Sequence, residues 1–188
     1  MTTLAPTLTT RLFPNLSAQL RDILLVLAGS LLMALCAQIV IPLQPVPITG
    51  QTFGVLLLGA ALGSKRGAAA MLAYIAEGAL GLPFFAGGAS GLAILTGTTA
   101  GYLVGFVIAA FVIGLLAERG LERSLRTSLV PFLVGTVIIY TFGVGWLAIV
   151  LGDVGKAIAL GMLPFLFGDA LKLIAAALVL PAAWKFIR

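Results

Sequence analysis

The sequence predicts an all-α membrane protein, a bundle of six transmembrane helices, and two observations lead to this prediction. Of the 188 residues, 61% are hydrophobic and 9% are charged, with a mean hydropathy of +1.21, whereas soluble domains carry about 25% charged residues. Long apolar stretches recur from residue 23 onward, each close to the roughly 20 residues that a helix needs to cross the hydrocarbon core. A soluble chain this short would have too much surface to cover without charges.

Prolines and glycines set the expected boundaries, because proline cannot continue the helical hydrogen-bond ladder. Residues 1–19 are polar and are expected to form a cytoplasmic tail or interfacial segment, followed by a transmembrane domain over residues 20–188. No removable signal peptide is recognised, so the first span is expected to be retained. The helices are expected over residues 20–41, 51–63, 67–81, 99–117, 129–150 and 164–184.

The connections between these helices are unusual in composition. Three prolines in residues 42–47 predict extended chain, and the apolar, glycine-rich residues 84–91 predict irregular backbone, which is tolerated at membrane depth where it lines a cavity. Residues 118–126 are expected to form a polar loop or interfacial helix, and residues 152–156 a turn.

The basic residues predict the orientation. With six spans, nine of the 11 Lys and Arg residues fall on the side of the termini, Lys156 falls opposite, and Lys172 lies within a span. The positive-inside rule therefore predicts a multi-pass protein of the cytoplasmic membrane with both termini in the cytoplasm. This distribution of Lys and Arg between the spans also accounts for the net charge of +5. A nucleic-acid-binding protein would instead gather its basic residues into one patch.

The sequence lacks the residues that several classes of function require. The chain has no His and a single cysteine, Cys36, so neither a transition-metal site nor a disulfide framework is predicted. It has no phosphate-binding Gly-rich loop ending in Lys-Ser/Thr, so nucleotide hydrolysis is not expected of this chain. No catalytic constellation and no cofactor are predicted, and the chain is not expected to be an enzyme.

Asp169 and Lys172 are the strongest candidate site. They are three residues apart in the last span, so they share one helix face, and ionisable residues within a membrane usually face a cavity or a partner. One interpretation is a salt bridge that only neutralises both charges. The other is a polar ligand site, in which the carboxylate accepts N–H bonds and the ammonium donates to a carbonyl or carboxylate.

Other polar or aromatic residues fall at the same outer end, each with an alternative role. Gln51 either reaches the site or caps the second helix. Glu77 either faces a cavity or reaches interfacial water. Trp146 either stacks on a ligand or anchors the chain at the interface. Separately, Ser30 and Ala34 in the first span have the small-xxx-small spacing that permits close helix approach.

Five segments in register resemble the BioY family, the substrate-binding S components of energy-coupling-factor (ECF) transporters for biotin. They are PVPITGQT (45–52), LGAALGSKRG (58–67), GLPFFAGG (81–88), TAGYLVGF (99–106) and PFLFGDALK (164–172). The resemblance covers about residues 38–172. It implies a six-helix S-component fold with an outward-facing biotin pocket, and uptake driven by ATP when a T-component scaffold and paired ABC ATPases join the S component.

The resemblance also implies roles for individual residues. Asp169 and Lys172 are expected to contact biotin, Asp169 on the ureido N–H side and Lys172 on either the ureido oxygen or the carboxylate. Some relatives carry a ligand-binding asparagine after the paired glycines, where this chain has Ala89. Ser90, the loop backbone, Glu77 or Gln51 is expected to replace that amide.

The resemblance further implies that small residues of the first helix, here Ser30 and Ala34, meet the T component. Two alternatives to biotin transport are an S component for another vitamin and a structural membrane subunit in which Asp169 and Lys172 only pair. Whether the ATPases are dedicated, shared or absent, with the protein acting alone as a homo-oligomer, stays open at this stage.

Overall fold

The computed structural model describes residues 17–187, except for the side chains of residue 125 and residues 183–187. The expected tail, residues 1–19, lies outside this part apart from its last three residues.

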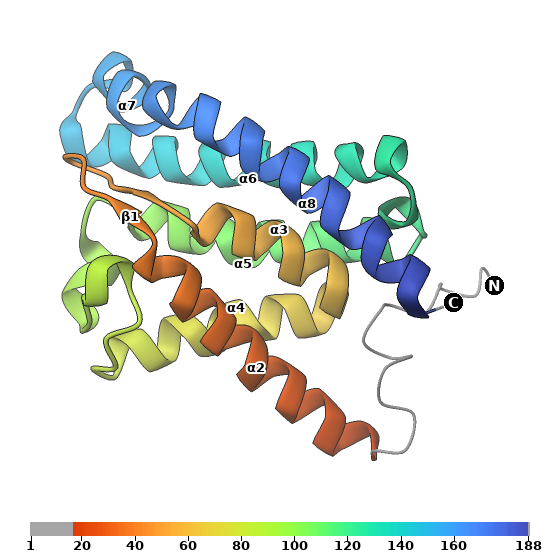
Figure 1. Cartoon of the computed structure of the whole chain (residues 1–188). Coiled ribbons are helices and arrows are strands. Elements are labelled where there is room, and N and C mark those ends of the chain that lie inside the picture. Colours follow the sequence, from red (N-terminus) through yellow and green to blue (C-terminus); the bar gives the residue numbers. More distant parts are fainter. Residues whose placement is uncertain (1–16, 188) are drawn as a thin grey trace.

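The described part of the chain is a bundle of helices, as the sequence predicts (Figure 1). The long elements are α2 (Ala18–Gln38), α3 (Gln51–Leu62), α4 (Ser64–Ala79), α5 (Ala100–Ala117), α6 (Leu125–Leu151) and α8 (Leu166–Ile187). Shorter elements are β1 (Val40–Ile41), β2 (Ile48–Thr49), α7 (Val154–Gly161) and the 3₁₀ turns η1 (Ala86–Gly88), η2 (Leu92–Thr96), η3 (Leu121–Arg123) and η4 (Leu163–Phe165).

Four apolar stretches in the described residues are long enough to cross a membrane: α2, α5, residues 126–151 of α6, and residues 154–182 across α7 and α8. The two remaining helices are shorter. At 1.5 Å per residue the 12 residues of α3 span about 18 Å, against about 30 Å for the hydrocarbon core. Helix α3 is short because residues 39–50 first lead the chain back from the end of α2 (Figure 1).

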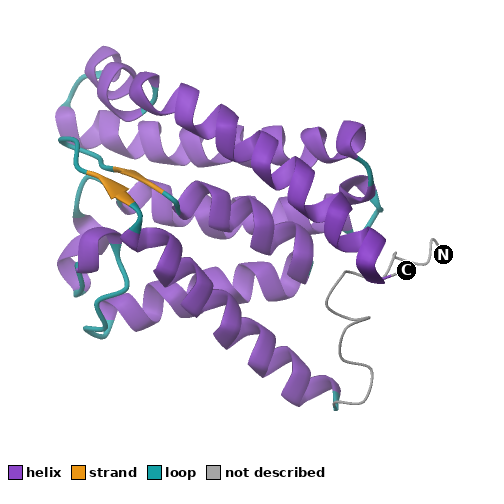
Figure 2. Cartoon of the chain, in the orientation of Figure 1, coloured by secondary structure: helices purple, strands orange, loops and turns teal. Residues whose placement is uncertain are grey.

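That returning segment is partly ordered as a two-stranded antiparallel ribbon. Val40 pairs with Thr49 and Ile41 with Ile48, so the proline-rich residues between them form its tip. The prediction of extended chain over residues 42–47 holds only in part: the chain there is not helical, but it bends at residues 44–46, and the extended pairs lie on either side. The first helix ends at Gln38 rather than at residue 41. Figure 2 shows the ribbon at the same end of the bundle as the loop after α4.

The structure corrects one predicted turn and several boundaries. Residues 154–161 form helix α7, not a turn, because the Asp153 carboxylate caps the helix by accepting from the Lys156 backbone N–H. Helix α6 begins at residue 125, four residues before the prediction, because the Ser124 hydroxyl accepts from the Thr127 N–H as an N-cap. Both are capping signals that the apolar pattern alone does not include.

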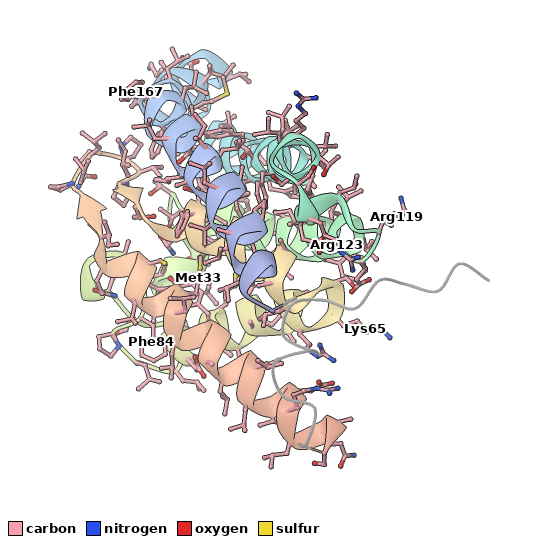
Figure 3. All side chains as sticks on the ribbon, turned by 45° about the vertical axis from the view of Figure 1, so that its right-hand side comes forward. Met33, Lys65, Phe84, Arg119, Arg123 and Phe167 are labelled. Atoms are coloured by element: carbon pink, nitrogen blue, oxygen red, sulfur yellow. The ribbon has the colours of Figure 1, made fainter. Side chains whose placement is uncertain are left out.

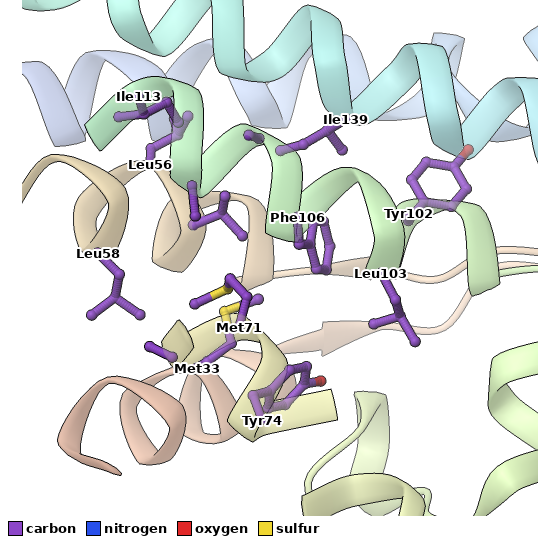
Figure 4. Packing of buried hydrophobic residues seen from close by; sticks show 14 of the residues in the cluster. Met33, Leu56, Leu58, Met71, Tyr74, Tyr102, Leu103, Phe106, Ile113 and Ile139 are labelled. Atoms are coloured by element: carbon purple, nitrogen blue, oxygen red, sulfur yellow. The ribbon is translucent and has the colours of Figure 1, made fainter. Parts of the chain in front are cut away.

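The core lies where α2, α3, α4, α5 and α6 face each other. Met33, Leu56, Met71, Phe106 and Ile139 are all buried there, and Figure 4 shows such side chains pointing into a shared interior. The outer faces are apolar as well, for example the 78% exposed Phe167 in α8 (Figure 3). An apolar exterior around a packed interior is what a bilayer favours, because the solvent around the spans is hydrocarbon.

The turn between α3 and α4 packs directly against α5. Gly63 has a φ of 84°, and the Glu118 carboxylate at the end of α5 accepts from both the N–H and the hydroxyl of Ser64, each at 2.8 Å. A Cβ at Gly114 of α5 would overlap the backbone atoms of Gly63 and Ser64. Only glycine therefore permits this approach.

We expect Gly114→Ala to lower the free energy of unfolding by about 3 kcal/mol, the upper part of the range for overpacking. The matched control is Gly145→Ala in α6, where an added Cβ meets nothing within 4 Å. Because alanine has a higher helix propensity than glycine, the stability of this variant should equal or slightly exceed that of the wild type. Thermal unfolding of the two purified variants in detergent measures the difference. Equal melting temperatures would contradict the packing argument.

Candidate functional site

Asp169 and Lys172 form an ion pair on the first turns of α8. The Lys172 ammonium donates to Asp169 Oδ1 at 2.8 Å. The side chain of Asp169 is 6% exposed and that of Lys172 is 20% exposed. The shared helix face predicted from their spacing is therefore confirmed. Two charges this well covered need further hydrogen bonds to offset their lost hydration.

Those hydrogen bonds come from α3, β2 and α6. Lys172 also donates to the backbone carbonyl of Thr49 at 2.6 Å and to the Thr52 hydroxyl at 3.0 Å. Thr52 in turn donates to Asp169 Oδ1 at 2.8 Å, and the Tyr140 hydroxyl donates to Asp169 Oδ2 at 2.6 Å. The pair thus holds together the start of α3, the middle of α6 and the start of α8.

The cluster lies on the wall of a cavity of about 250 Å³. Its polar lining groups include Thr49, Gln51, Thr52, Tyr140, Asp169 and Lys172. Most of the remaining wall is apolar, with side chains from the ribbon, the loop after α4, helices α5 and α6, and the turn η4 before α8: Val46, Phe85, Ala89, Ile94, Leu103, Phe106, Ile139 and Phe165. An apolar cavity with a few converging polar groups is the usual form of a small-molecule site.

Gln51 belongs to this wall and does not cap its helix. The N-cap of α3 is Gly50, without a side-chain cap. The Gln51 amide instead donates to the Tyr74 hydroxyl at 2.7 Å and accepts from the Thr49 hydroxyl at 2.9 Å. The capping interpretation is therefore wrong, and the interpretation that Gln51 reaches the site agrees with its position.

The loop after α4 brings Ala89 to the cavity and leaves Ser90 out. Ala89 lines the cavity, whereas Ser90 is exposed and is not part of the lining. Glu77 is also absent from the lining; it is half-buried, and its Oε2 has no hydrogen-bond partner among the described residues. The expectation that Ser90 or Glu77 replaces a ligand-binding amide thus conflicts with where their side chains lie.

Trp146 acts on the loop and not on the cavity. Its indole N–H donates to the carbonyl of Gly97 at 2.9 Å, and Gly97 is a lining residue while Trp146 is not. The neighbouring Thr98 hydroxyl donates to the carbonyl of Pro45 at 2.8 Å. Trp146 therefore holds a loop that lines the cavity, a role that neither the stacking nor the anchor interpretation included.

Ser30 and Ala34 are covered by their own chain, at 0% and 6% exposure. The Ser30 hydroxyl donates to the Leu27 carbonyl at 2.9 Å, and the adjacent Gly29 approaches Ala70 and Leu62. Close helix approach in this part of α2 therefore occurs inside the bundle, where Gly29 meets residues of α3 and α4. The prediction that they meet a partner conflicts with this burial.

The sequence reasoning missed Thr52 and Tyr140 as members of the cluster. Thr52 is the last residue of the segment PVPITGQT, which resembles the family, and Tyr140 carries a hydroxyl in the middle of an apolar span. A polar group at that depth is a signal of a partner. Among the described residues no group of three or more His, Cys, Asp and Glu could hold a metal ion.

Comparison with known proteins finds a matching family and similar proteins. The model of the BioY family matches residues 8–188. The biotin transporter BioY of Thermotoga maritima is 46% identical over 143 residues, 76% of this chain and 83% of that protein. The biotin transporter BioY of Rhizobium etli is 42% identical over 142 residues, 72% and 76% of the two chains.

A solved structure shares the fold. It is the crystal structure of the S-component for biotin from an ECF-type ABC transporter, with a TM-score of 0.81 and 24% identity, over 90% of this chain and 95% of that one. At this identity the match shows the architecture. Together with the family model and the two relatives, it leads to one assignment: the chain belongs to the BioY family.

Proposed function

We propose that this protein binds biotin and takes it up across the cytoplasmic membrane as the S component of an ECF-type transporter, with ATP hydrolysis supplied by partner subunits. The observation that carries the proposal is the cavity with Asp169 and Lys172 on its wall, in a chain of a family whose relatives are biotin transporters. A T-component scaffold and ABC ATPases are the partners that this function requires.

The cavity suits the chemistry of biotin. Its volume of about 250 Å³ lies just below the range of about 300–1,000 Å³ typical of sites for drug-sized ligands, so it fits a small molecule. The fused rings and the valerate chain are largely apolar, like most of the lining. The ureido group carries two N–H donors, which a carboxylate is suited to accept, and we assign this role to Asp169.

The distribution of charge supports an outward-facing cavity. Lys65, Arg119 and Arg123 lie toward one end of the bundle (Figure 3). The cavity wall contains the first residues of α3, whereas Lys65 follows the last residue of that helix, so the basic end is opposite. Under the positive-inside rule the basic end and the termini are cytoplasmic, and the cavity accepts its ligand from outside.

Ligand-dependent thermal stability of the purified protein in detergent tests the proposal. A ligand that binds only the folded state stabilises it by about 2.7 kcal/mol at 100 times its Kd, so biotin should raise the melting temperature clearly. Thiamin and riboflavin should leave it unchanged. A higher melting temperature with one of those vitamins and not with biotin would indicate a different transported substrate. An unchanged melting temperature with all three would indicate that the ion pair only stabilises the structure.

A further inference from the structure

A second hollow, a groove of about 570 Å³, lies between the last turns of α6 and the first turns of α7. Among the described residues it shares no lining residue with the Asp169 cavity. Gly145 lines the groove, and an added Cβ at this glycine would meet nothing within 4 Å, so the groove is open there. The apolar side chains of its walls are those of Val144, Ala148, Ile149, Val154 and Ile158.

The position of the groove along α6 places it where lipid chains meet their head groups. The 27 residues of α6 span about 40 Å at 1.5 Å per residue, which exceeds the hydrocarbon core of about 30 Å, so the last turns of α6 approach the polar interface. Residues 144–152 cover only about 12 Å of the helix at this end. Helix α7 follows at the same end of the bundle as the ribbon (Figure 1). The groove therefore faces the upper part of an acyl chain.

One acidic and one basic residue lie together at this groove. Asp153 lines it, and the Lys156 ammonium is 3.8 Å from Asp153 Oδ2, which is longer than a hydrogen bond. Asp153 Oδ1 accepts from the Lys156 backbone N–H. Within the described part of the chain neither Oδ2 nor the ammonium takes part in a hydrogen bond. The pair thus offers an open acceptor and an open donor side by side.

We propose that this groove binds one molecule of phosphatidylethanolamine, with an acyl chain between α6 and α7 and the head group on Asp153 and Lys156. The charges are complementary, because the lipid phosphate accepts from the Lys156 ammonium and the primary ammonium of the lipid donates to Asp153 Oδ2. Lipid chains are as apolar as the groove itself, so filling the groove does not discriminate among lipids. The head group therefore decides which lipid binds.

Two other phospholipids fit the pair less well. Phosphatidylcholine has the same phosphate, but its quaternary ammonium has no N–H to donate to Asp153. Phosphatidylglycerol has no cation, and its negative charge would lie beside the Asp153 carboxylate. Phosphatidylethanolamine should consequently bind about fivefold more tightly than phosphatidylcholine, the factor that one exposed ion pair supplies.

Native mass spectrometry of the whole chain in detergent, titrated with the dioleoyl form of each lipid, measures these affinities. Asp153→Asn keeps a side chain that can cap α7 and should make phosphatidylethanolamine and phosphatidylcholine bind equally. Lys156→Ala should weaken the binding of both by about fivefold, because both carry the phosphate. Lys65→Ala is the control for loss of a charge, since this exposed lysine lies at the opposite end of the bundle.

Gly145→Leu tests the groove itself. The added side chain would project into the open space and occupy the place of the acyl chain, so the saturable lipid adduct should disappear with all three lipids. The matched control is Ala159→Leu, which adds the same bulk at an exposed position of α7 outside the groove and should bind lipid as the wild type does. Asp153→Asn and Lys156→Ala alter no buried packing, so they test the proposal even if Gly145→Leu does not fold.

Three results would overturn the proposal. The first is equal affinity of the wild type for phosphatidylethanolamine and phosphatidylcholine, or a preference for phosphatidylglycerol. The second is an unchanged lipid adduct in Gly145→Leu, which would place the lipid elsewhere. The third is a dimer of the wild type that Gly145→Leu abolishes, which would show that a second copy covers the groove. None of these measurements uses biotin, so their outcome is independent of the proposed function.

Discussion

Asp169→Asn is expected to weaken biotin binding by about 100-fold or more. The carboxylate accepts three hydrogen bonds, from Thr52, Lys172 and Tyr140, and in our proposal one more from a ureido N–H. An amide has only one oxygen, so its NH₂ group must face donors on one side. Hydrogen bonds to charged groups are worth about 1.5–3 kcal/mol each, which gives the expected size of the loss. Titration calorimetry of the purified variant with biotin measures it.

The chain contains its own control for this experiment. Asp153 and Lys156 form a second i, i+3 pair, at 3.8 Å and with 43% and 70% exposure, and neither residue lines the Asp169 cavity. Asp153→Asn keeps a side chain that can cap α7 and should leave biotin affinity unchanged. Unchanged affinity in Asp169→Asn would remove this carboxylate from the site.

Lys172→Ala is expected to lower the stability of the protein and to abolish measurable biotin binding. It leaves Asp169 as a buried, 5% exposed carboxylate without its counter-ion, and removing one partner of a buried pair costs about 3–5 kcal/mol. It also frees the Thr49 carbonyl, which is held by the ammonium at 2.6 Å. Thermal unfolding without ligand and calorimetry with biotin measure the two effects.

A double variant distinguishes loss of folding from loss of the site. Asp169→Asn/Lys172→Met removes both charges while keeping the volume, and replacing a whole buried pair is often nearly neutral for stability. The double variant should therefore melt closer to the wild type than Lys172→Ala does, and still not bind biotin. Lys156→Ala, at the exposed pair, should alter neither quantity. Biotin binding by the double variant would show that the pair serves stability alone.

Much of the architecture followed from local properties of the sequence. Hydropathy located the long helices, and the prolines accounted for the absence of helix between α2 and α3. The spacing of Asp169 and Lys172 placed them on one face, because three residues are close to one helical turn. The errors at α6 and α7 came from caps, in which single side chains at Ser124 and Asp153 extend or create a helix that the apolar pattern does not show.

The candidate site was predicted less completely, because its members meet only through packing. Gln51, Ala89, Asp169 and Lys172 line one cavity, and their contact with a ligand stays a prediction. Ser90 follows Ala89 directly, yet the loop turns its side chain outward. Glu77 and Trp146 were placed at the correct end of the bundle, but depth along a helix does not determine which way a side chain points.

The sequence by itself therefore determined the membrane class, the six long helices, and the ion pair at i and i+3, since all three depend on residues close together in the chain. Only the tertiary structure decided what surrounds that pair. Thr52 and Tyr140 reach Asp169 across 117 and 29 residues of sequence, and Ser30 and Ala34 are buried within the bundle. Such contacts depend on how whole helices pack against one another, and no local pattern of residues specifies that packing.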